Sequence, residues 1–88
     1  MITAAQLKAA RALIGVDQRH LAQASGLSLP TIQRMEASNG TIRGNVDSLM
    51  KLIGGLDALG IELINEGAES VGGGRGVRLK TPPGAGAG

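Results

Sequence analysis

Hydrophobic residues recur about every three or four positions through the first 60 residues of this chain, as they do along amphipathic helices. The spacing predicts a helix over about 4–14, a second between Asp17 and Gly26, a third over about 28–37 and a fourth over about 46–59. A loop over 38–44 separates the last two. The apolar stripe of the first helix consists of Leu7, Ala10, Leu13 and Ile14, and that of the fourth of Val46, Leu49, Leu52, Ile53, Leu56 and Leu59.

The residues that begin and end these helices follow a repeated pattern. Thr3 and Gln6 form a capping box, and Gly15 and Gly26 stand where a left-handed residue ends a helix. Pro30 falls in a first helical turn, where its missing N–H has no partner to lose. N-caps for the later helices are Asp17, Ser28 and Asn45. Hydrophobic staples fit the pairs Ile2–Leu7, Val16–Leu21 and Leu27–Ile32.

Two adjacent glycines, Gly54 and Gly55, interrupt the fourth helix, and each costs roughly 1 kcal/mol relative to alanine. The pair is consistent with a weak or bent turn. It is also consistent with a place where another helix approaches closely. The sequence leaves both interpretations open.

The period changes from 3.6 to 2 after Gly60. Ile61 and Leu63 flank Glu62, and a second alternating run covers 77–80, with opposite charges on one face. This pattern predicts a β-hairpin over 61–80 with a long glycine-rich connection from about 66 to 76. Because an isolated hairpin is marginal in water, we expect it to pack on the fourth helix or to pair with a second copy. Residues 81–88 contain no core residue and are expected to be a disordered tail.

Composition narrows the possible functions. The 88 residues include no cysteine, no aromatic residue and one histidine. Disulfides, thiolate or multi-histidine metal sites and aromatic stacking of single-stranded nucleic acid are therefore excluded. No apolar run reaches the ~20 residues of a membrane span, and the first residues lack the layout of a signal peptide. We expect a soluble, cytoplasmic, nucleoid-associated domain that is stabilised by a partner chain.

Charge is distributed unevenly between the two halves of the chain. Residues 45–88 contain four cations and five carboxylates, for a net charge of −1. The first 44 residues have a net charge of +3, from Lys8, Arg11, Arg19, Arg34 and Arg43 against Asp17 and Glu36. The first half is therefore the expected polyanion-binding face.

Three small or branched residues have the spacing of a bihelical DNA-reading unit. Ala22 leaves room for the third helix to cross the second, Gly26 permits a tight turn, and Ile32 points into the shared core. With these residues, the segment QRHLAQASGLSLPTIQRMEA, residues 18–37, resembles the helix-turn-helix family of Cro and Xre-like phage-type repressors. The resemblance extends over residues 3–59. It implies a mainly α, four-helix repressor-like domain over 1–60, followed here by the hairpin and tail.

Helical geometry separates the two sides of the third helix. At about 100° per residue, Met35 and Glu36 lie near the inward-pointing Ile32. The opposite side and its flanks present the candidate base-reading residues Leu29, Pro30, Gln33 and Arg34. Arg34 suits the O6/N7 edge of guanine, Gln33 suits adenine or a phosphate, and the two apolar residues suit a thymine methyl.

The resemblance also implies a set of phosphate contacts. In this family the residue matching Gln18, at the start of the second helix, grips the sugar-phosphate backbone, where the helix dipole favours an anion. The hydroxyls of Ser28 and Thr31 are further candidates, although Ser28 also fits as a cap. Asn39, Thr41 and Arg43 in the following loop are expected to contact the adjacent phosphate.

This chain departs from the family pattern in two places. Leu29 and Pro30 occupy positions where relatives often have Gln or Ser, which reduces hydrogen-bond readout. A hairpin replaces the fifth helix of many repressors. The mode of dimerisation therefore does not follow from the resemblance.

Other signals point away from catalysis. His20 faces solvent on the second helix, and the glycine-rich run 72–76 lacks the Lys-Ser/Thr ending of a phosphate loop. We expect no catalytic residues, no metal and no cofactor.

These features predict a sequence-specific regulator of transcription, by default a repressor, that binds double-stranded DNA as a homodimer with residues 28–37 in the major groove. The alternative is an antitoxin or another protein-interaction module that engages a partner protein through the hairpin or tail.

Overall fold

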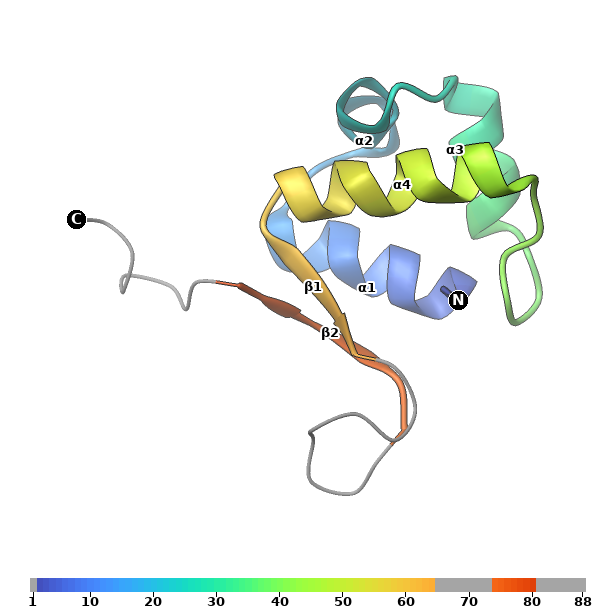
Figure 1. Cartoon of the computed structure of the whole chain (residues 1–88). Coiled ribbons are helices and arrows are strands. Elements are labelled where there is room, and N and C mark those ends of the chain that lie inside the picture. Colours follow the sequence, from blue (N-terminus) through green and yellow to red (C-terminus); the bar gives the residue numbers. More distant parts are fainter. Residues whose placement is uncertain (1, 65–73, 81–88) are drawn as a thin grey trace.

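The computed structural model describes residues 2–64 and 74–80. Four helices come first, α1 (Ala4–Ile14), α2 (Gln18–Ser25), α3 (Leu29–Glu36) and α4 (Val46–Ala58). Strands β1 (Ile61–Ile64) and β2 (Gly76–Leu79) follow as an antiparallel pair (Figure 1). The predicted mainly α fold with a C-terminal hairpin is confirmed. Most of the predicted glycine-rich connection, and the whole predicted tail over 81–88, lie outside the described residues.

The helix ends follow the local signals in the sequence. Thr3 and Gln6 form the predicted capping box, and Gly15 and Gly26 end α1 and α2 with φ of 71° and 72°. Side-chain oxygens cap the other three helices, with acceptors on Asp17, Ser28 and Asn45. Because each cap is specified within a few residues, the helix boundaries agree with the sequence prediction to within about two residues.

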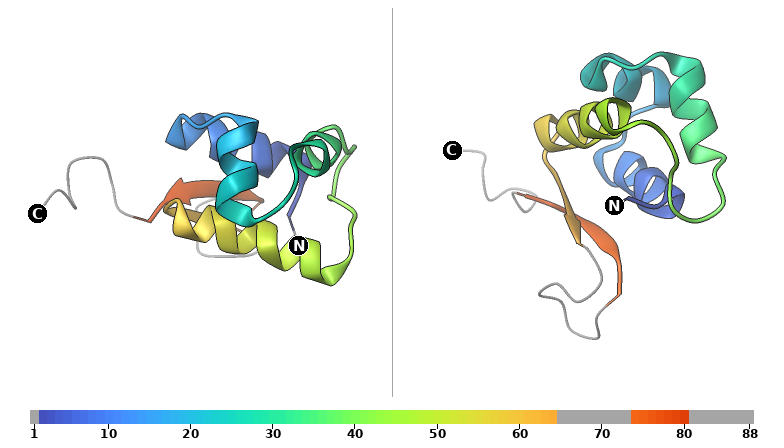
Figure 2. Two further views of the ribbon diagram at one scale, coloured as in Figure 1. Left: turned by 90° about the horizontal axis from the view of Figure 1, so that it is seen from above. Right: turned by 45° about the vertical axis from the view of Figure 1, so that its right-hand side comes forward.

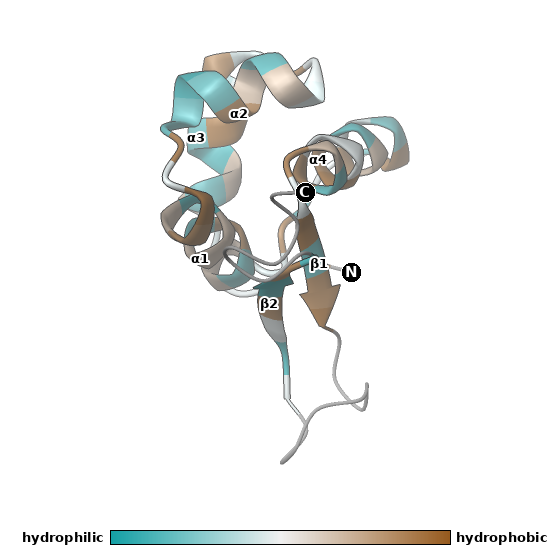
Figure 3. Cartoon of the chain, turned by 90° about the vertical axis from the view of Figure 1, so that its left-hand side faces the viewer, coloured by the Kyte–Doolittle hydropathy of each residue, from teal (hydrophilic) through white to brown (hydrophobic). Residues whose placement is uncertain are grey.

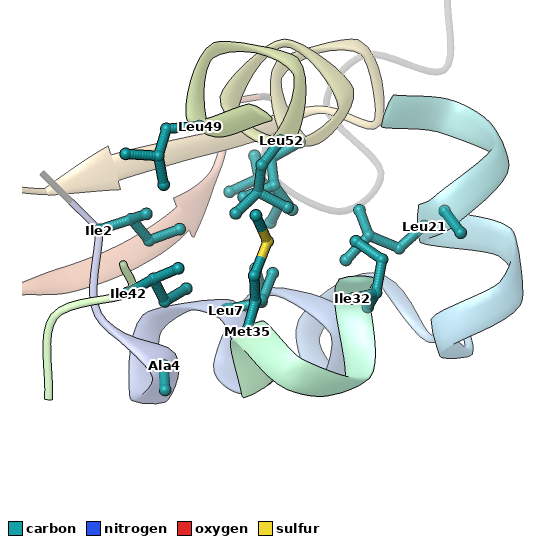
Figure 4. Close-up of a cluster of buried hydrophobic side chains, with 13 residues drawn as sticks. Ile2, Ala4, Leu7, Leu21, Ile32, Met35, Ile42, Leu49 and Leu52 are labelled. Carbon is teal, nitrogen blue, oxygen red and sulfur yellow. The ribbon is translucent and has the colours of Figure 1, made fainter. Parts of the chain in front are cut away.

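An aliphatic core joins the helices and the hairpin (Figure 4). Its fully buried large side chains are Ile2, Leu7, Leu21, Ile32, Met35, Leu52 and Leu56. Two predicted core residues are wrong: Leu13 is 46% exposed and Val46 is 72% exposed. Both lie at the margin of the buried stripe, since Val46 is about 80° around the helix from Leu56 and Leu13 is about 120° from Leu7.

The hairpin and the α2–α3 pair lie on different sides of the molecule. In Figure 1, α2 lies above α4, while the hairpin extends below α4 and alongside α1. The right-hand view in Figure 2 shows the same separation, with α2 and α3 at one end of the molecule and the two strands at the other. The surface of α2 and α3 is therefore open to a partner that does not touch the hairpin.

A close contact between α2 and α4 explains one of the paired glycines. A Cβ on Gly55 would lie 2.7 Å from the Cα of Ser25, whereas a Cβ on Gly54 would have nothing within 4 Å. The buried Ser25 hydroxyl donates to the Leu21 carbonyl, 2.8 Å away, so no polar group is stranded at this crossing. The second interpretation of the glycine pair is correct for Gly55, because α2 passes directly over it.

Gln6 attaches the hairpin to α1, a role that the sequence analysis did not assign. This residue is 4% exposed, and its amide Nε2 donates to the carbonyl oxygens of Ile64 at 3.2 Å and Gly76 at 3.0 Å. Its Oε1 accepts from the Thr3 backbone N–H in the capping box. The Gln6 amide thus hydrogen-bonds both the first backbone N–H of the α1 capping box and two backbone carbonyls of the hairpin.

The two glycines of α4 give a matched test of the helix crossing. Gly54→Ala should raise the free energy of unfolding by about 0.5–1 kcal/mol, because alanine loses less backbone entropy in an exposed helix position. Gly55→Ala should lower it by about 1–3 kcal/mol, because the added methyl group collides with the backbone of α2. Urea denaturation monitored by circular dichroism measures both changes in the free energy of unfolding. Equal effects of the two substitutions would contradict the close contact between α2 and α4.

Gln6→Glu tests the hairpin attachment with little change in shape. The carboxylate can still cap α1, but it places an acceptor where Nε2 donated to two carbonyl oxygens. We expect the free energy of unfolding to fall by about 2–4 kcal/mol. Slower amide hydrogen exchange in the variant hairpin than in wild type would contradict this role.

Candidate nucleic-acid interface

A short turn fixes α3 against α2. Gly26 turns the chain in the left-handed region, and the Leu27 N–H donates to the Ala22 carbonyl at 3.0 Å. Ala22 is 5% exposed and Ile32 is fully buried, as the sequence analysis expected from their size and spacing. The α2–α3 unit is therefore held by a glycine turn on one side and by the core on the other.

The two sides of α3 differ sharply in exposure. Ile32, Met35 and Glu36 are buried, while Pro30, Gln33, Arg34 and Ala37 are exposed and Leu29 is half-buried. Figure 3 shows hydrophilic residues along α2 and α3. The four predicted base-reading residues thus lie together on the open side and flank of one helix, the arrangement that a groove-binding helix needs.

A buried carboxylate joins three helices behind this exposed side. Glu36, in the last turn of α3, is 6% exposed and accepts from the Arg11 guanidinium of α1 through Nε at 2.5 Å and NH2 at 2.9 Å. The Gln18 amide of α2 donates to the same carboxylate at 3.1 Å. Arg11 also donates to the carbonyl of Val16 at 3.2 Å. Arg11 had been expected to contribute to a polyanion-binding surface, so this cluster was not predicted from the sequence.

One signal in the sequence could have revealed the cluster. Helical geometry already placed Glu36 near the inward-pointing Ile32, and a buried carboxylate requires a cationic or hydrogen-bonding partner. The partner itself could not be chosen without the fold, because Arg11 lies 25 residues away in the chain.

The environment of Glu36 keeps it charged. Burial alone would raise the pKa of its carboxyl group, but hydrogen bonds from Arg11 and Gln18, with the positive charges of Arg11 and Lys8, lower the pKa below its ordinary value. The hydrogen bond to Glu36 in turn raises the pKa of Arg11. The pair therefore stays ionised, and Arg11 contributes no net charge to the surface.

Three of the predicted phosphate-binding residues already have partners within the chain. The Gln18 amide is bound to Glu36, as described above. Ser28 caps α3: its Oγ accepts from the Thr31 N–H at 3.3 Å and lies 2.8 Å from the Thr31 Oγ1. One hydroxyl of this pair donates to the other, which leaves one hydroxyl hydrogen for an outside acceptor. These side chains are oriented before any ligand binds.

The other three predicted phosphate-binding residues lie on an anchored loop. Asn39, Thr41 and Arg43 are all exposed. Between them, the Gly40 carbonyl accepts from the Ala4 N–H at 2.9 Å, and the N–H of Ile42 donates to the Ile2 carbonyl at 3.0 Å. Ile42 itself is 2% exposed. The loop is therefore fixed to the start of α1, with its polar side chains pointing outward.

Apart from Arg11, which is paired with Glu36, and Arg75, the cations divide into two groups. Lys51, Arg78 and Lys80 form ion pairs with Asp47, Glu62 and Asp57, respectively. Among the described residues, Lys8, Arg19, Arg34 and Arg43 form no ion pair with a carboxylate, and all four belong to the first 44 residues. The positive charge still available to an outside anion is thus concentrated in the helical half, on α1, α2, α3 and the anchored loop.

Other kinds of site find no support in the part of the chain that the structure describes. His20 is exposed, and its backbone N–H is held by Asp17 at 2.7 Å. Residues 2–64 and 74–80 contain no cluster of three or more metal-binding side chains. No helix in these ranges has the length and hydropathy to cross a bilayer.

The pH dependence of the free energy of unfolding tests the buried ion pair between Arg11 and Glu36. Because the pKa of Glu36 is lower in the folded than in the unfolded chain, its contribution to stability is complete above pH 4.5, the ordinary value. That contribution is lost as the pH falls through the folded pKa. Glu36→Gln should cost about 2 kcal/mol at neutral pH, less than a fully buried pair because Arg11 is 24% exposed. The variant should also lose stability less steeply in acid.

Glu62→Gln is the matched control, since Glu62 forms an exposed ion pair with Arg78. Removing it should change neutral stability much less than Glu36→Gln does. Denaturation curves measured from neutral to acidic pH supply both comparisons. If stability falls with pH as steeply in Glu36→Gln as in wild type, the Glu36 carboxylate is not the group whose titration causes the loss.

Comparison with known proteins adds no assignment to this geometry. A scan against protein-family models and a search of curated proteins find no match to the chain. Function is therefore inferred from the α2–α3 unit, the anchored loop and the cations that have no carboxylate partner among the described residues.

Proposed function

We propose that this protein is a sequence-specific regulator of transcription that binds double-stranded DNA as a homodimer, with α3 in the major groove. The observation that carries the proposal is the open side of α3: Pro30, Gln33 and Arg34 are exposed, while the opposite side of the same helix is buried. A helix held in this way can enter a groove without being pulled from the core.

The chemistry of the open side fits base edges. The B-DNA major groove is about 12 Å wide and admits an α-helix. The planar guanidinium of Arg34 matches the two acceptors of guanine, and the Gln33 amide matches adenine. Leu29 and Pro30 add apolar contact with thymine methyl groups but no hydrogen bonds. Discrimination between bases would therefore depend mainly on Arg34 and Gln33.

The surroundings of α3 supply contacts to the backbone of the duplex. Arg43 on the anchored loop and Arg19 on α2 are exposed cations without a carboxylate partner among the described residues. Such contacts fix the position of a protein on DNA and contribute affinity that falls with added salt. They do not select a sequence.

A single helix of eight residues reads few base pairs. Two copies related by a twofold axis would place their α3 helices in successive major grooves, about 34 Å apart, on a nearly palindromic site. Binding across a promoter would then repress transcription by occlusion. No separate ligand-sensing module is needed for that mechanism.

Paired arginine variants test the proposal. Arg34→Ala should weaken binding to the selected site by about 1–3 kcal/mol and relax the preference at one base position. Arg43→Ala should weaken binding to all duplexes alike and reduce the salt dependence. Lys51→Ala removes an exposed cation of α4 that is already paired with Asp47, so it should change binding little.

The duplex for this test comes from selection on a randomised library with the purified chain. Binding titrations on the selected and a scrambled duplex separate base reading from phosphate contact. Equal losses of Arg34→Ala on the two duplexes would refute base reading by Arg34. Failure of the wild-type chain to bind any duplex in low salt would refute the proposal as a whole.

A further inference from the structure

The outer edge of β2 presents backbone N–H and C=O groups that have no hydrogen-bond partner among the described residues. The Lys80 N–H donates to the Gly60 carbonyl at 2.8 Å, and Glu62 and Ile64 are paired with Arg78 and Gly76. Hydrogen-bonded and non-hydrogen-bonded pairs alternate along an antiparallel ladder. The backbone N–H and C=O groups of even-numbered β2 residues therefore point toward β1, and those of odd-numbered residues point away from it. The N–H and C=O groups of Val77 and Leu79 therefore point outward, and they bond to no other described residue.

A hollow of about 260 Å³ lies beside the same edge, between α1 and β2. Its walls are mainly apolar: Ala5 and Ala9 line it from α1, and Arg75 and Val77 line it from the hairpin. Ala5 and Ala9 are exposed. The hollow is smaller than typical ligand pockets, which measure about 300–1,000 Å³ and contain several convergent polar groups. It fits one or two aliphatic side chains from a neighbouring strand.

We propose that a second copy of this chain binds at the outer edge of β2 and fills the hollow beside it. The two β2 strands pair antiparallel and form a four-stranded sheet of order β1-β2-β2-β1. In this arrangement the twofold axis passes beside Val77. Val77 of one protomer lies opposite Val77 of the other, and Leu79 lies opposite Arg75 of the other protomer. The outward N–H and C=O groups on both strands become hydrogen-bonded, and Val77 and Leu79 of each protomer enter the hollow of the other.

Side-chain chemistry favours a second copy in this register. Val77 and Leu79 lie on the helix-facing side of the strand and are only half-buried in the single chain, so they have apolar surface left to bury. On the other side of the sheet, Arg78 falls opposite Gly76 and not opposite another arginine. Arg78 also keeps its own ion pair with Glu62, at 2.9 Å. The pairing therefore places no two like charges directly opposite each other across the axis.

The pairing also resolves a weakness of the hairpin. A two-stranded sheet is marginally stable when isolated, and although Gln6 and the core hold this one, its unprotected edge strand is still a template for another chain. The inference rests on the proposed function only in assigning this dimer to DNA binding. Dimer formation itself can be measured without DNA.

Two pairs of variants test the interface by sedimentation equilibrium of the full chain. Val77→Pro removes an outward N–H of β2 and should weaken the dimer at least tenfold, whereas Leu63→Pro removes an outward N–H of β1 and should not. Ala9→Gln fills the hollow and should also weaken the dimer at least tenfold. Ala12→Gln changes an exposed alanine on the same helix outside the hollow and should leave the dissociation constant unchanged. Circular dichroism confirms that each variant is folded.

The possible results separate this proposal from the proposed function. Loss of dimer in Ala9→Gln but not in Ala12→Gln supports the interface. A wild-type chain that stays monomeric up to about 1 mM overturns it, even if the monomer binds DNA. A dimer weakened by Leu63→Pro but not by Val77→Pro also overturns it, because β1 would then be the paired edge. A dimer that responds as expected but binds no duplex leaves the interface intact and contradicts DNA binding.

Discussion

The ion pair between Arg11 and Glu36 fixes the geometry on which the rest of the helical domain depends. Hydrophobic burial holds the helices together but is not directional, so by itself it allows small rotations of one helix against another. A buried carboxylate with three donors allows much less freedom, because any rotation that breaks a hydrogen bond leaves a charge without a partner. Since the donors come from α1 and α2, the cluster fixes the rotation of α3 and, with it, the residues that α3 presents outward.

Close packing compensates for the short elements. The helices α2 and α3 have eight residues each, too few to be stable alone in water. Their stability comes from tertiary contacts made by small and aliphatic side chains, since the chain has no aromatic residue to fill space. Gly55 is the clearest case, because it lets α2 approach α4 to backbone contact. The glycine weakens α4 locally but permits the crossing that holds α2 in place.

Local signals predicted most of this fold, and contacts between distant residues account for what they missed. Caps and glycine ends specify helix limits within a few residues, and the period change after Gly60 located the hairpin. Sequence distance hid the partner of Glu36 and the bonds from Gln6 to the hairpin, because neither follows from spacing within one element. Val46 and Leu13 were wrongly predicted to be buried, because periodicity gives the direction of the apolar side of a helix but not how far around the helix burial extends. The exposed side of α3 was predictable, because once Ile32 is taken as the inward residue, helical periodicity assigns the side of every other residue.

The absence of aromatic side chains also determines how the protein can be observed. Peptide groups absorb in the far ultraviolet, but no side chain here contributes a near-ultraviolet band or intrinsic fluorescence. The bases of any bound nucleic acid would therefore dominate the near-ultraviolet spectrum of a purified sample. One tryptophan introduced at the exposed Leu13 would be the sole fluorophore in the chain, free of background from any other residue.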